Sequence, residues 1–437
     1  MNLIPENEAA PVQADQRIVT LDLLRGFAVL GILLVNMWAY ALPFPASLNP
    51  HMLGFDTVSD RLVHLLVFMI SYTKTMPIFA ILFGAGILLF TQRQEDRGNK
   101  PAKLFLRRQF WLLVIGLAHA YLIWNGDILV PYATTGVIVF FLRKRSTRTL
   151  LILAIVALII PKLGAQAGSL FMEKMQVEAE AGLVAEAEGR DLTTGQMRAR
   201  DQWVDIDKEW NPTPEDLEET QSIMRGGYWN MVTHYAPETM IMHLFMYPMF
   251  INWNLGSFML LGMVLFRTGV LTGEKSALFY RKMAFSCYAL GLPLSLLALW
   301  VFNTQFNLIA MIRWGFPLMN ISGPLVALGH IALLCLAWKL GWLGSFQYRL
   351  MAVGRMAFTN YLTQTLICGA LFFGFGFGLF GALHRPALLA VTVAIWALQL
   401  WWSPWWLARF RFGPLEWLWR SLTYGRWQPF YIYPDKT

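Results

Sequence analysis

Charged residues are scarce in this chain. Asp, Glu, Lys and Arg together make up only 14% of its 437 residues, whereas they make up about 25% of an average soluble domain. Hydrophobic residues account for 56%, and the mean hydropathy is +0.46. These proportions exclude an ordinary water-soluble domain.

Cysteine is also rare. The three cysteines, Cys287, Cys335 and Cys368, each fall inside an apolar run, and no Cys-x-x-Cys pair occurs. Histidine does not recur at the fixed spacing that metal sites use. The sequence therefore indicates neither a disulfide framework nor a zinc site, and we expect no metal cofactor.

Acidic residues are fewer than basic ones. The chain has 27 Asp and Glu against 35 Lys and Arg, a net charge of +8. In a soluble protein this surplus would favour a nucleic-acid partner. Here Lys and Arg bunch in short loops between apolar runs, as they do on the cytoplasmic side of membrane proteins. We therefore expect no nucleic-acid partner.

Long apolar runs are abundant. Runs of roughly 18 or more apolar residues recur along the whole chain, which is typical of transmembrane helices. The first run lacks the basic n-region and the small-residue cleavage site of a signal peptide, so we expect it to remain a span. The sequence predicts an all-α polytopic membrane protein with about ten transmembrane helices, at approximately 20–42, 64–90, 104–123, 128–142, 149–171, 239–266, 278–302, 316–338, 355–378 and 386–407.

The loops between these runs alternate in charge, which predicts the orientation of the chain. Loops rich in Lys and Arg lie at 91–108, 143–148, 267–282 and 339–355 and in the C-terminal tail. Loops poor in them lie at 43–63, 124–127, 172–238, 303–315 and 379–385. Both termini are therefore predicted to be cytoplasmic.

This orientation divides the chain into five parts. They are a cytoplasmic tail (1–19), a first membrane bundle of five helices (20–171), an acidic extracytoplasmic loop (172–238), a second bundle of five helices (239–407) and a cytoplasmic interfacial segment (408–437). The acidic loop contains a helical stretch, and it is either a solvated cap or a lid over an external cavity. The last segment contains GPLEWLWRSLTYG, an aromatic and amphipathic pattern that favours an interfacial helix.

The stretch GLAHAYLIWNGDILVPYATTG, residues 116–136, places polar side chains between two apolar halves. His119 lies near the outer end of the third predicted helix, and Asp127 follows in the outward turn. A histidine oriented by a carboxylate is the usual arrangement of a general base, so we predict that role for the pair. The alternative is that the pair only ties two helices together.

Four further residues are predicted to lie on the same side of the membrane. Asn36 lies near the outer end of the first helix and His51 in the loop after it, and we assign both to the catalytic group. Trp124 and Asn125 lie in the outward turn itself, and we assign both to a substrate-binding group.

Three basic residues are predicted to form a vestibule at the cytoplasmic end. Arg25 shares a helix face with Asp22 at i, i+3, and the neighbouring Gly26 permits another helix to approach closely. Together with Lys74 and Arg355, this guanidinium could hold a phosphate or carboxylate. The alternatives are a salt-bridged anchor for Arg25 and an internal ion pair for Lys74.

The stretch GRMAFTNYLTQTL, residues 354–366, carries a polar stripe in the ninth helix. Arg355, Thr359 and Thr363 follow one another at i, i+4 and i+8, with Asn360 and Gln364 beside them. Either the stripe is the wall of a hydrophilic passage, in which Asn360 and Gln364 contact substrate, or it supplies interhelical hydrogen bonds.

Five ordered motifs resemble the YeiB-type bacterial inner-membrane family, whose domain has no assigned function. They cover nearly the whole chain: LDLLRGFAVLGILLVNM, FAILFGAG, HAYLIWNGDILVPYATTG, GRMAFTNYLTQTL and GPLEWLWRSLTYG. The resemblance implies a multi-pass protein of the bacterial inner membrane. In this family His119 belongs to the stronger motif.

The first motif is also similar to the opening of membrane acyltransferases typified by heparan-alpha-glucosaminide N-acetyltransferase. Asp22, Arg25, Gly26 and Asn36 match that opening, and His51 would take the place of the catalytic histidine, although its loop is several residues longer. The similarity implies an acyl-CoA donor in the cytoplasm and an acceptor at the outer face.

Two functions follow as hypotheses. The first is a membrane-embedded acyltransferase that moves an acyl group from cytoplasmic acyl-CoA to an acceptor at the outer face. The second is a transporter or exporter of a small amphipathic compound. The expected partners are membrane lipids and a small-molecule or glycan acceptor. The oligomeric state stays open, with a homodimer as one alternative.

Overall fold

The computed structural model describes residues 17–49, 52–53, 57–304 and 307–432. Helices dominate these residues, and none of them forms a strand, although one isolated bridge pairs Phe410 with Tyr431. The predicted all-α class is confirmed.

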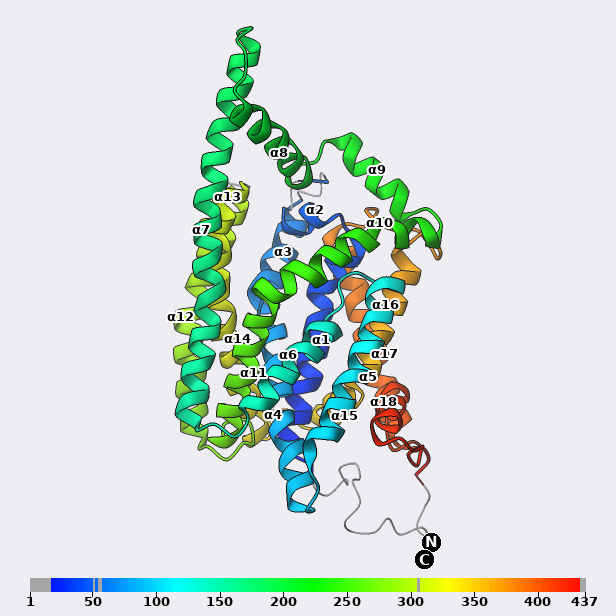
Figure 1. Ribbon diagram of the computed structural model, residues 1–437. Coiled ribbons are helices and arrows are strands. Elements are labelled where there is room, and N and C mark those ends of the chain that lie inside the picture. Colours follow the sequence, from blue (N-terminus) through cyan, green and yellow to red (C-terminus); the bar gives the residue numbers. More distant parts are fainter. Residues whose placement is uncertain (1–16, 50–51, 54–56, 305–306, 433–437) are drawn as a thin grey trace, which may run out of the picture.

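The helices run mostly along one axis and form a single bundle (Figure 1). Those of the first half are α1 (Val19–Ala41), α2 (Phe44–Leu48), α3 (Val58–Ile70), α4 (Thr75–Asp96), α5 (Pro101–Leu122), α6 (Leu129–Leu142) and α7 (Thr147–Ala187). Those of the connecting region are α8 (Thr194–Trp210), α9 (Pro214–Met224) and α10 (Tyr228–Ile241). Those of the second half are α11 (Asn252–Arg267), α12 (Ala277–Thr304), α13 (Leu308–Ala310), α14 (Phe316–Lys339), α15 (Phe346–Arg355), α16 (Ala357–Phe372), α17 (Arg385–Leu407) and α18 (Pro414–Tyr424).

The chain is a polytopic membrane protein. Seven helical stretches among the described residues are long and apolar enough to cross a membrane: Val19–Ala41, Val58–Asp96, Thr147–Ala187, Tyr228–Arg267, Ala277–Thr304, Leu308–Lys339 and Arg385–Leu407. The helices α5, α6 and α16 do not meet that measure, yet they lie in the same bundle (Figure 1). The number of ten crossings therefore stays a prediction.

The second predicted span differs most from the structure. Instead of one helix at 64–90, the chain forms α3 and α4 with a break at 71–74. Thr73 adopts φ 61°, a left-handed conformation that ends a helix. Pro77 in the first turn of α4 has no N–H to continue the hydrogen bonding of α3. This break places Lys74 at the start of α4.

Two close helix crossings hold the bundle together. An added Cβ at Gly26 of α1 would lie 2.1 Å from the Leu350 carbonyl oxygen of α15, and one at Gly354 would lie 2.0 Å from that of Asp22. Gly84 of α4 and Gly262 of α11 meet equally closely. Glycine is required here because the two backbones touch. The predicted close approach at Gly26 is confirmed.

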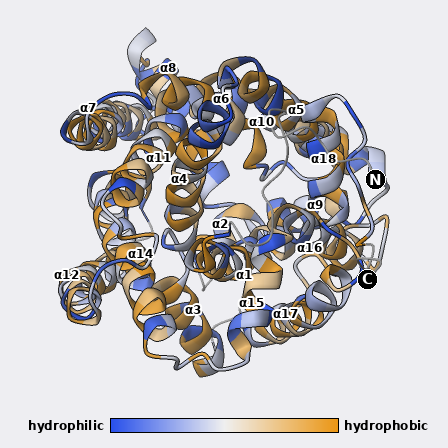
Figure 2. Ribbon diagram, turned by 90° about the horizontal axis from the view of Figure 1, so that it is seen from below, coloured by the Kyte–Doolittle hydropathy of each residue, from blue (hydrophilic) through white to orange (hydrophobic). Residues whose placement is uncertain are grey.

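The helix α1 lies near the middle of the bundle, as the view from one end shows (Figure 2). Of its most apolar window 72% is buried, against 22% for α7 at the periphery. Because α1 is buried and carries Asp22 and Arg25 in its first turns, these charged side chains need partners within the bundle.

Beyond the bundle, α7 continues past the predicted end of the fifth span at 171 into the acidic region, where the sequence predicts a helical stretch, and α8 folds back against it (Figure 1). Met175, Ala179 and Ala199 form a small apolar contact between them. Trp210 at the end of α8 packs against Phe44 of α2. The acidic region is thus a helical cap that rests on one end of the bundle.

The basic loops lie at the opposite end of the bundle from this cap, together with the first turn of α1 and with α18 (Figure 1). We expect this end to face the cytoplasm. In a Cys287→Ser background, a membrane-impermeant maleimide should label Asp191→Cys in intact spheroplasts, because Asp191 is exposed after α7. It should label Lys100→Cys, exposed before α5, only after permeabilisation. The reverse labelling pattern would contradict the orientation.

Candidate functional site

A cavity of about 210 Å³ lies among α1, α4, α5, α6, α16 and α18. A second cavity of about 180 Å³ lies nearer the basic end. The two adjoin, because both are lined by Arg25, Arg108 and Trp419. Together they make a path from the basic end toward the middle of the bundle.

The part of this path nearest the basic end of the bundle is strongly basic, and we call it the basic mouth. The arginines lining the two cavities are Arg17, Arg25, Arg93, Arg97, Arg108, Arg355 and Arg420. Asp22 accepts a hydrogen bond from Arg25 at 2.8 Å, as the i, i+3 spacing predicts, and one from Arg17 at 3.5 Å. Two carboxylates, Asp22 and Glu416, line the cavities against these seven arginines, which leaves a clear surplus of positive charge, so the mouth is suited to an anion with several negative groups.

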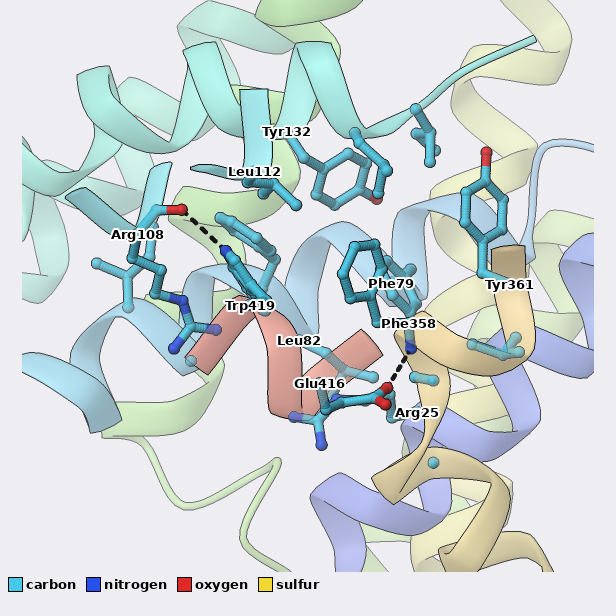
Figure 3. A pocket seen from close by; sticks show the side chains of 18 of the residues that line it. Arg25, Phe79, Leu82, Arg108, Leu112, Tyr132, Phe358, Tyr361, Glu416 and Trp419 are labelled. Carbon is cyan, nitrogen blue, oxygen red and sulfur yellow. Dashed lines mark hydrogen bonds between the residues drawn. The ribbon is translucent and has the colours of Figure 1, made fainter. Parts of the chain in front are cut away.

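The helix α18 closes one side of the mouth (Figure 3). The Glu416 carboxylate accepts hydrogen bonds from the backbone N–H groups of Phe358 and Thr359, in the first turn of α16. The Trp419 indole donates to the Arg108 carbonyl oxygen, and the Arg108 guanidinium lies 4.2 Å from the centroid of the Trp419 ring. Glu416 therefore caps the start of α16 and fixes α18 against it.

The inner part of the path is apolar, and we call it the chamber. Its wall includes Phe79, Leu82, Phe83, Leu112 and Tyr132, and Figure 3 shows several of these side chains facing one another across the space. The far wall includes Ile128 and Tyr361.

A buried histidine–carboxylate pair lies directly behind that far wall. His119 Nδ1 lies 2.8 Å from Asp127 Oδ1, and the two side chains are 1% and 0% exposed. The Tyr361 ring lies 5.6 Å from the His119 ring between centroids. Tyr361 therefore stands between the chamber and the pair, and the predicted pairing of His119 with Asp127 is present.

The hydrogen bonds around His119 define its tautomer. An ionised Asp127 only accepts, so Nδ1 carries the hydrogen. Nε2 then accepts from the Thr365 hydroxyl at 3.2 Å, and the Thr365 oxygen lies 2.8 Å from the Tyr40 hydroxyl. The basic nitrogen of the imidazole thus points toward α16 and α1, away from the carboxylate.

Asp127 also has structural contacts. Its second carboxylate oxygen accepts from Val130 N–H at 2.7 Å and so caps the start of α6. Its backbone carbonyl accepts from the Tyr247 hydroxyl at 2.8 Å. Either interpretation of the pair, general base or helix tie, fits these contacts, so the catalytic role stays a prediction.

Of the three residues predicted to form the vestibule, two line it. Arg25 and Arg355 are brought together by the crossing of Gly26 with Gly354. Lys74 lies elsewhere: its ammonium group is fully buried, donates to the Phe68 carbonyl oxygen at 2.8 Å and lines neither cavity. The break between α3 and α4 turns Lys74 back onto the end of α3, so its inclusion in the vestibule is corrected.

The residues predicted near His119 have separate positions. Trp124 is buried, with its ring 4.0 Å from that of Tyr40 and 6.4 Å from that of His119. Asn125 points outward and donates to Glu238 of α10. Asn36 is half-buried one turn before Tyr40, on the face of α1 that Arg25 shares. His51 lies outside the described residues.

Asn360 and Gln364 line neither cavity. Asn360 bonds to the Ser403 hydroxyl and the Trp402 indole of α17, while Gln364 bonds to Gln399 of α17. Both amides are used in interhelical hydrogen bonds, so their predicted contact with substrate stays a prediction that these two cavities do not support. Interhelical hydrogen bonding was the alternative interpretation of the stripe.

Sequence reasoning missed several lining residues, namely Arg108, Gln109, Tyr361, Glu416, Trp419 and Arg420. The loop charge places Arg108 in the basic loop 91–108, yet this residue lies within α5. The spacing of Glu416, Trp419 and Arg420 at i, i+3 and i+4 was a usable signal, because it places them on one face of α18. In the described part of the chain, no three His, Cys, Asp or Glu side chains are grouped to hold a metal ion.

Comparison with known proteins finds bacterial relatives that match nearly the whole chain. "Uncharacterized protein YeiB" of Escherichia coli (strain K12) is 31% identical over 419 residues, which cover 93% of this chain and 96% of that protein. The chain belongs to the YeiB family. "Uncharacterized protein YxaH" of Bacillus subtilis (strain 168) is 28% identical over 431 residues, 96% of this chain and 97% of the relative. No solved structure matches the chain significantly.

The family described as "Protein of unknown function (DUF418)" matches residues 265–426. This range includes Arg355, Tyr361 and Glu416 of the cavity wall. Arg25 and the His119–Asp127 pair lie before it. The names of these YeiB-family relatives state no activity, so the resemblance to membrane acyltransferases rests on the sequence motifs alone.

Proposed function

We propose that this protein is an acyltransferase of the bacterial cytoplasmic membrane, which moves a short acyl group from cytoplasmic acyl-CoA to an acceptor at the outer face. The observation that carries the proposal is the path through the bundle: a mouth lined by arginines, an apolar chamber, and a buried histidine–carboxylate pair behind the end of the chamber. The mouth would hold the phosphates of the donor, the chamber its pantetheine arm, and the far end of the chamber its thioester, next to the pair.

The basic mouth suits the phosphates of CoA. Arginine binds phosphate through a rigid, permanently charged fork of N–H donors, so several arginines around one opening favour a polyanionic head group. Arg108 and His119 are eleven residues apart on α5, an axial separation of about 16 Å. An extended pantetheine arm is of comparable length, so a head group at the mouth would bring the thioester near the pair.

The path leaves room beyond the pantetheine arm for only a small acyl group. The cavity that contains the chamber, and that also reaches Arg25 and Arg108 of the mouth, has a volume of about 210 Å³, which is below the roughly 300–1,000 Å³ typical of pockets for drug-sized ligands. An acetyl or similarly short group fits better than a long fatty chain, and we therefore use acetyl-CoA as the probe.

The proposed step balances without a metal or redox partner. His119 Nε2 takes the proton from the hydroxyl or amine of the acceptor as that atom attacks the thioester carbonyl carbon. The new C–O or C–N bond forms, the C–S bond breaks, and the CoA thiolate takes up the proton that His119 removed from the acceptor, which returns the imidazole to its neutral form. Asp127 holds Nδ1–H and stabilises the imidazolium that forms. Tyr361 must move aside, since it separates the chamber from the pair.

The donor site can be tested by binding. Arg25→Ala should weaken acetyl-CoA binding by about 10–100-fold, because a hydrogen bond to a charged group contributes roughly 1.5–3 kcal/mol. Isothermal titration of the purified protein in nanodiscs measures this change. Raised salt should weaken binding to the parent in the same direction.

The matched control is Arg281→Ala, because Arg281 is exposed at the start of α12 and lines neither cavity. It should bind acetyl-CoA like the parent. Equal affinities for the Arg25→Ala variant, the Arg281→Ala variant and the parent would count against the mouth as the donor site.

Transport is the second candidate, and the break between α3 and α4 favours it. Interrupted membrane helices with freed backbone groups are frequent at the substrate sites of transporters, and Thr73 and Lys74 form such a break. Proteoliposomes distinguish the two functions: a transporter moves a compound unchanged, whereas the acyltransferase consumes acetyl-CoA and releases free thiol.

A further inference from the structure

Gln109 is the least satisfied residue in the cavity wall. It lies on α5 and is only 2% exposed. Neither its amide oxygen nor its amide nitrogen has a hydrogen-bond partner among the described residues. Burying such a group without a partner costs about 1–3 kcal/mol, and native proteins leave few groups in this state. An amide that is unpaired on both sides and borders a cavity calls for a ligand.

The position of Gln109 is specific. It follows Arg108 of the basic mouth and lies one turn before Leu112 of the chamber. A Cβ added to Gly136 of α6 would lie 3.2 Å from the Gln109 amide oxygen, so the glycine leaves room for the amide. Gln109 therefore sits at the border between the polar and the apolar parts of the path.

We infer that Gln109 recognises an amide group in the donor, and that the ligand of this cavity carries a secondary amide between its anionic head and its acyl end. This inference rests on the proposed function and names the part of the donor to which Gln109 hydrogen-bonds. The Gln109 side chain offers one acceptor and an NH2 donor, and both are unpaired. A secondary amide supplies an N–H for the oxygen and a C=O for the NH2 group.

Other amphiphiles match less well. An ester, an ether or a phosphate offers acceptors only, so the Gln109 oxygen would stay unpaired in a buried site. The pantetheine arm of CoA contains two secondary amides, whereas phospholipids and alkyl phosphates contain none in their chains. The same cavity wall thus distinguishes acyl-CoA from the lipids that surround the protein.

Tyr361 gives a second observation of the same kind. Its side chain is 5% exposed and borders the far end of the chamber, and its hydroxyl, which lies against the Ile128 backbone N–H, donates to no acceptor among the described residues. A hydroxyl there can donate to a carbonyl oxygen, and the thioester carbonyl of a bound donor is the group expected at that depth. The Gln109 amide and the Tyr361 hydroxyl then mark the amide and thioester positions of one ligand.

The experiment compares two ligands and two variants by titration in nanodiscs. Gln109→Leu keeps the size of the side chain and removes its polar atoms. It should weaken acetyl-CoA binding by about tenfold, the effect of roughly 1.4 kcal/mol of lost hydrogen bonding. Its affinity for dodecyl phosphate, which has an anionic head and no amide, should equal that of the parent. The ligand-free variant should melt no lower than the parent, because Gln109 has no partner to lose.

Gln176→Leu is the matched control, since Gln176 lies on the exposed part of α7, and it should bind both ligands like the parent. If the parent binds acetyl-CoA and Gln109→Leu binds it equally well, the amide recognition is wrong while the proposed function stands. If Gln109→Leu weakens both ligands alike, the residue only shapes the cavity and the inference is overturned. A parent that binds no acetyl-CoA overturns the proposed function and the inference with it.

Discussion

Replacement of His119 by alanine is expected to abolish acyl transfer while leaving the protein folded in the membrane. Loss of a general base typically lowers a rate by about 10²–10⁴-fold. The assay follows labelled acetyl groups from acetyl-CoA into the material of membrane vesicles that contain the protein. His234→Ala is the matched control, because His234 is exposed on α10 and lines neither cavity. This variant should retain the parent rate.

The contacts of His119 make a second variant more informative. In Asp127→Asn the side-chain oxygen can still accept from Val130 N–H, so the start of α6 keeps its cap. The new NH2 group would then face Nδ1 of His119, which must become an acceptor, and the hydrogen moves to Nε2. In that tautomer Nε2 already carries a hydrogen, so it cannot take a proton from the hydroxyl or amine of the acyl acceptor. The same loss occurs in serine proteases whose triad aspartate is changed to asparagine.

The two interpretations of the His119–Asp127 pair, general base and helix tie, predict different results for these variants. A catalytic pair predicts that Asp127→Asn loses activity with a melting temperature near that of the parent. A helix tie predicts that His119→Ala and Asp127→Asn both melt earlier and lose activity only to the extent that they unfold. Full activity of a stable His119→Ala protein would remove His119 from the mechanism.

Local features of this site could be predicted from the sequence. The Asp22–Arg25 contact follows from i, i+3 spacing on one helix, and the His119–Asp127 contact joins residues only eight positions apart across one turn. In both cases chain connectivity alone limits how far the partners can separate. Loop charge likewise identified the end of the molecule at which the mouth opens.

The cavity could not be predicted in the same way. Its wall is assembled from helices far apart in the chain, so that Gln109, Tyr361 and Glu416 become neighbours only through tertiary packing. A single glutamine in an apolar helix carries no periodic signal. The prediction for Lys74 is wrong because a helix break redirects this side chain. The break depends on the left-handed conformation of Thr73, and such a conformation is usually signalled in a sequence by glycine, which is absent at this position.

Replacement of Gly354 by valine is expected to prevent assembly of the bundle and of the mouth together. A Cβ at this position would lie 2.0 Å from the Asp22 carbonyl oxygen and 2.7 Å from Gly26 N. Both are backbone atoms of a helix near the centre of the bundle, so they cannot move without displacing α1. Overpacking of a buried contact typically costs about 1–3 kcal/mol, and a clash between two backbones should reach at least the upper end of that range.

This crossing is also what places the arginines. Gly26 follows Arg25 and Gly354 precedes Arg355, so the contact between the two glycines sets the distance between two guanidinium groups of the mouth. The milder Gly354→Ala should therefore reduce acetyl-CoA affinity in whatever fraction still folds, whereas Arg25→Ala should reduce affinity without a loss of accumulation. Membrane accumulation, elution as a single species and melting temperature are measured for each variant.

Gly164→Ala is the control for glycine replacement as such. Gly164 lies in α7 with nothing within 4 Å of an added Cβ, and alanine stabilises a helix interior by about 0.5–1 kcal/mol relative to glycine. This variant should accumulate and melt at or above the parent. If Gly354→Val matched it, α1 and α15 would not cross as closely as their backbones indicate, and the mouth would need another explanation for the pairing of Arg25 with Arg355.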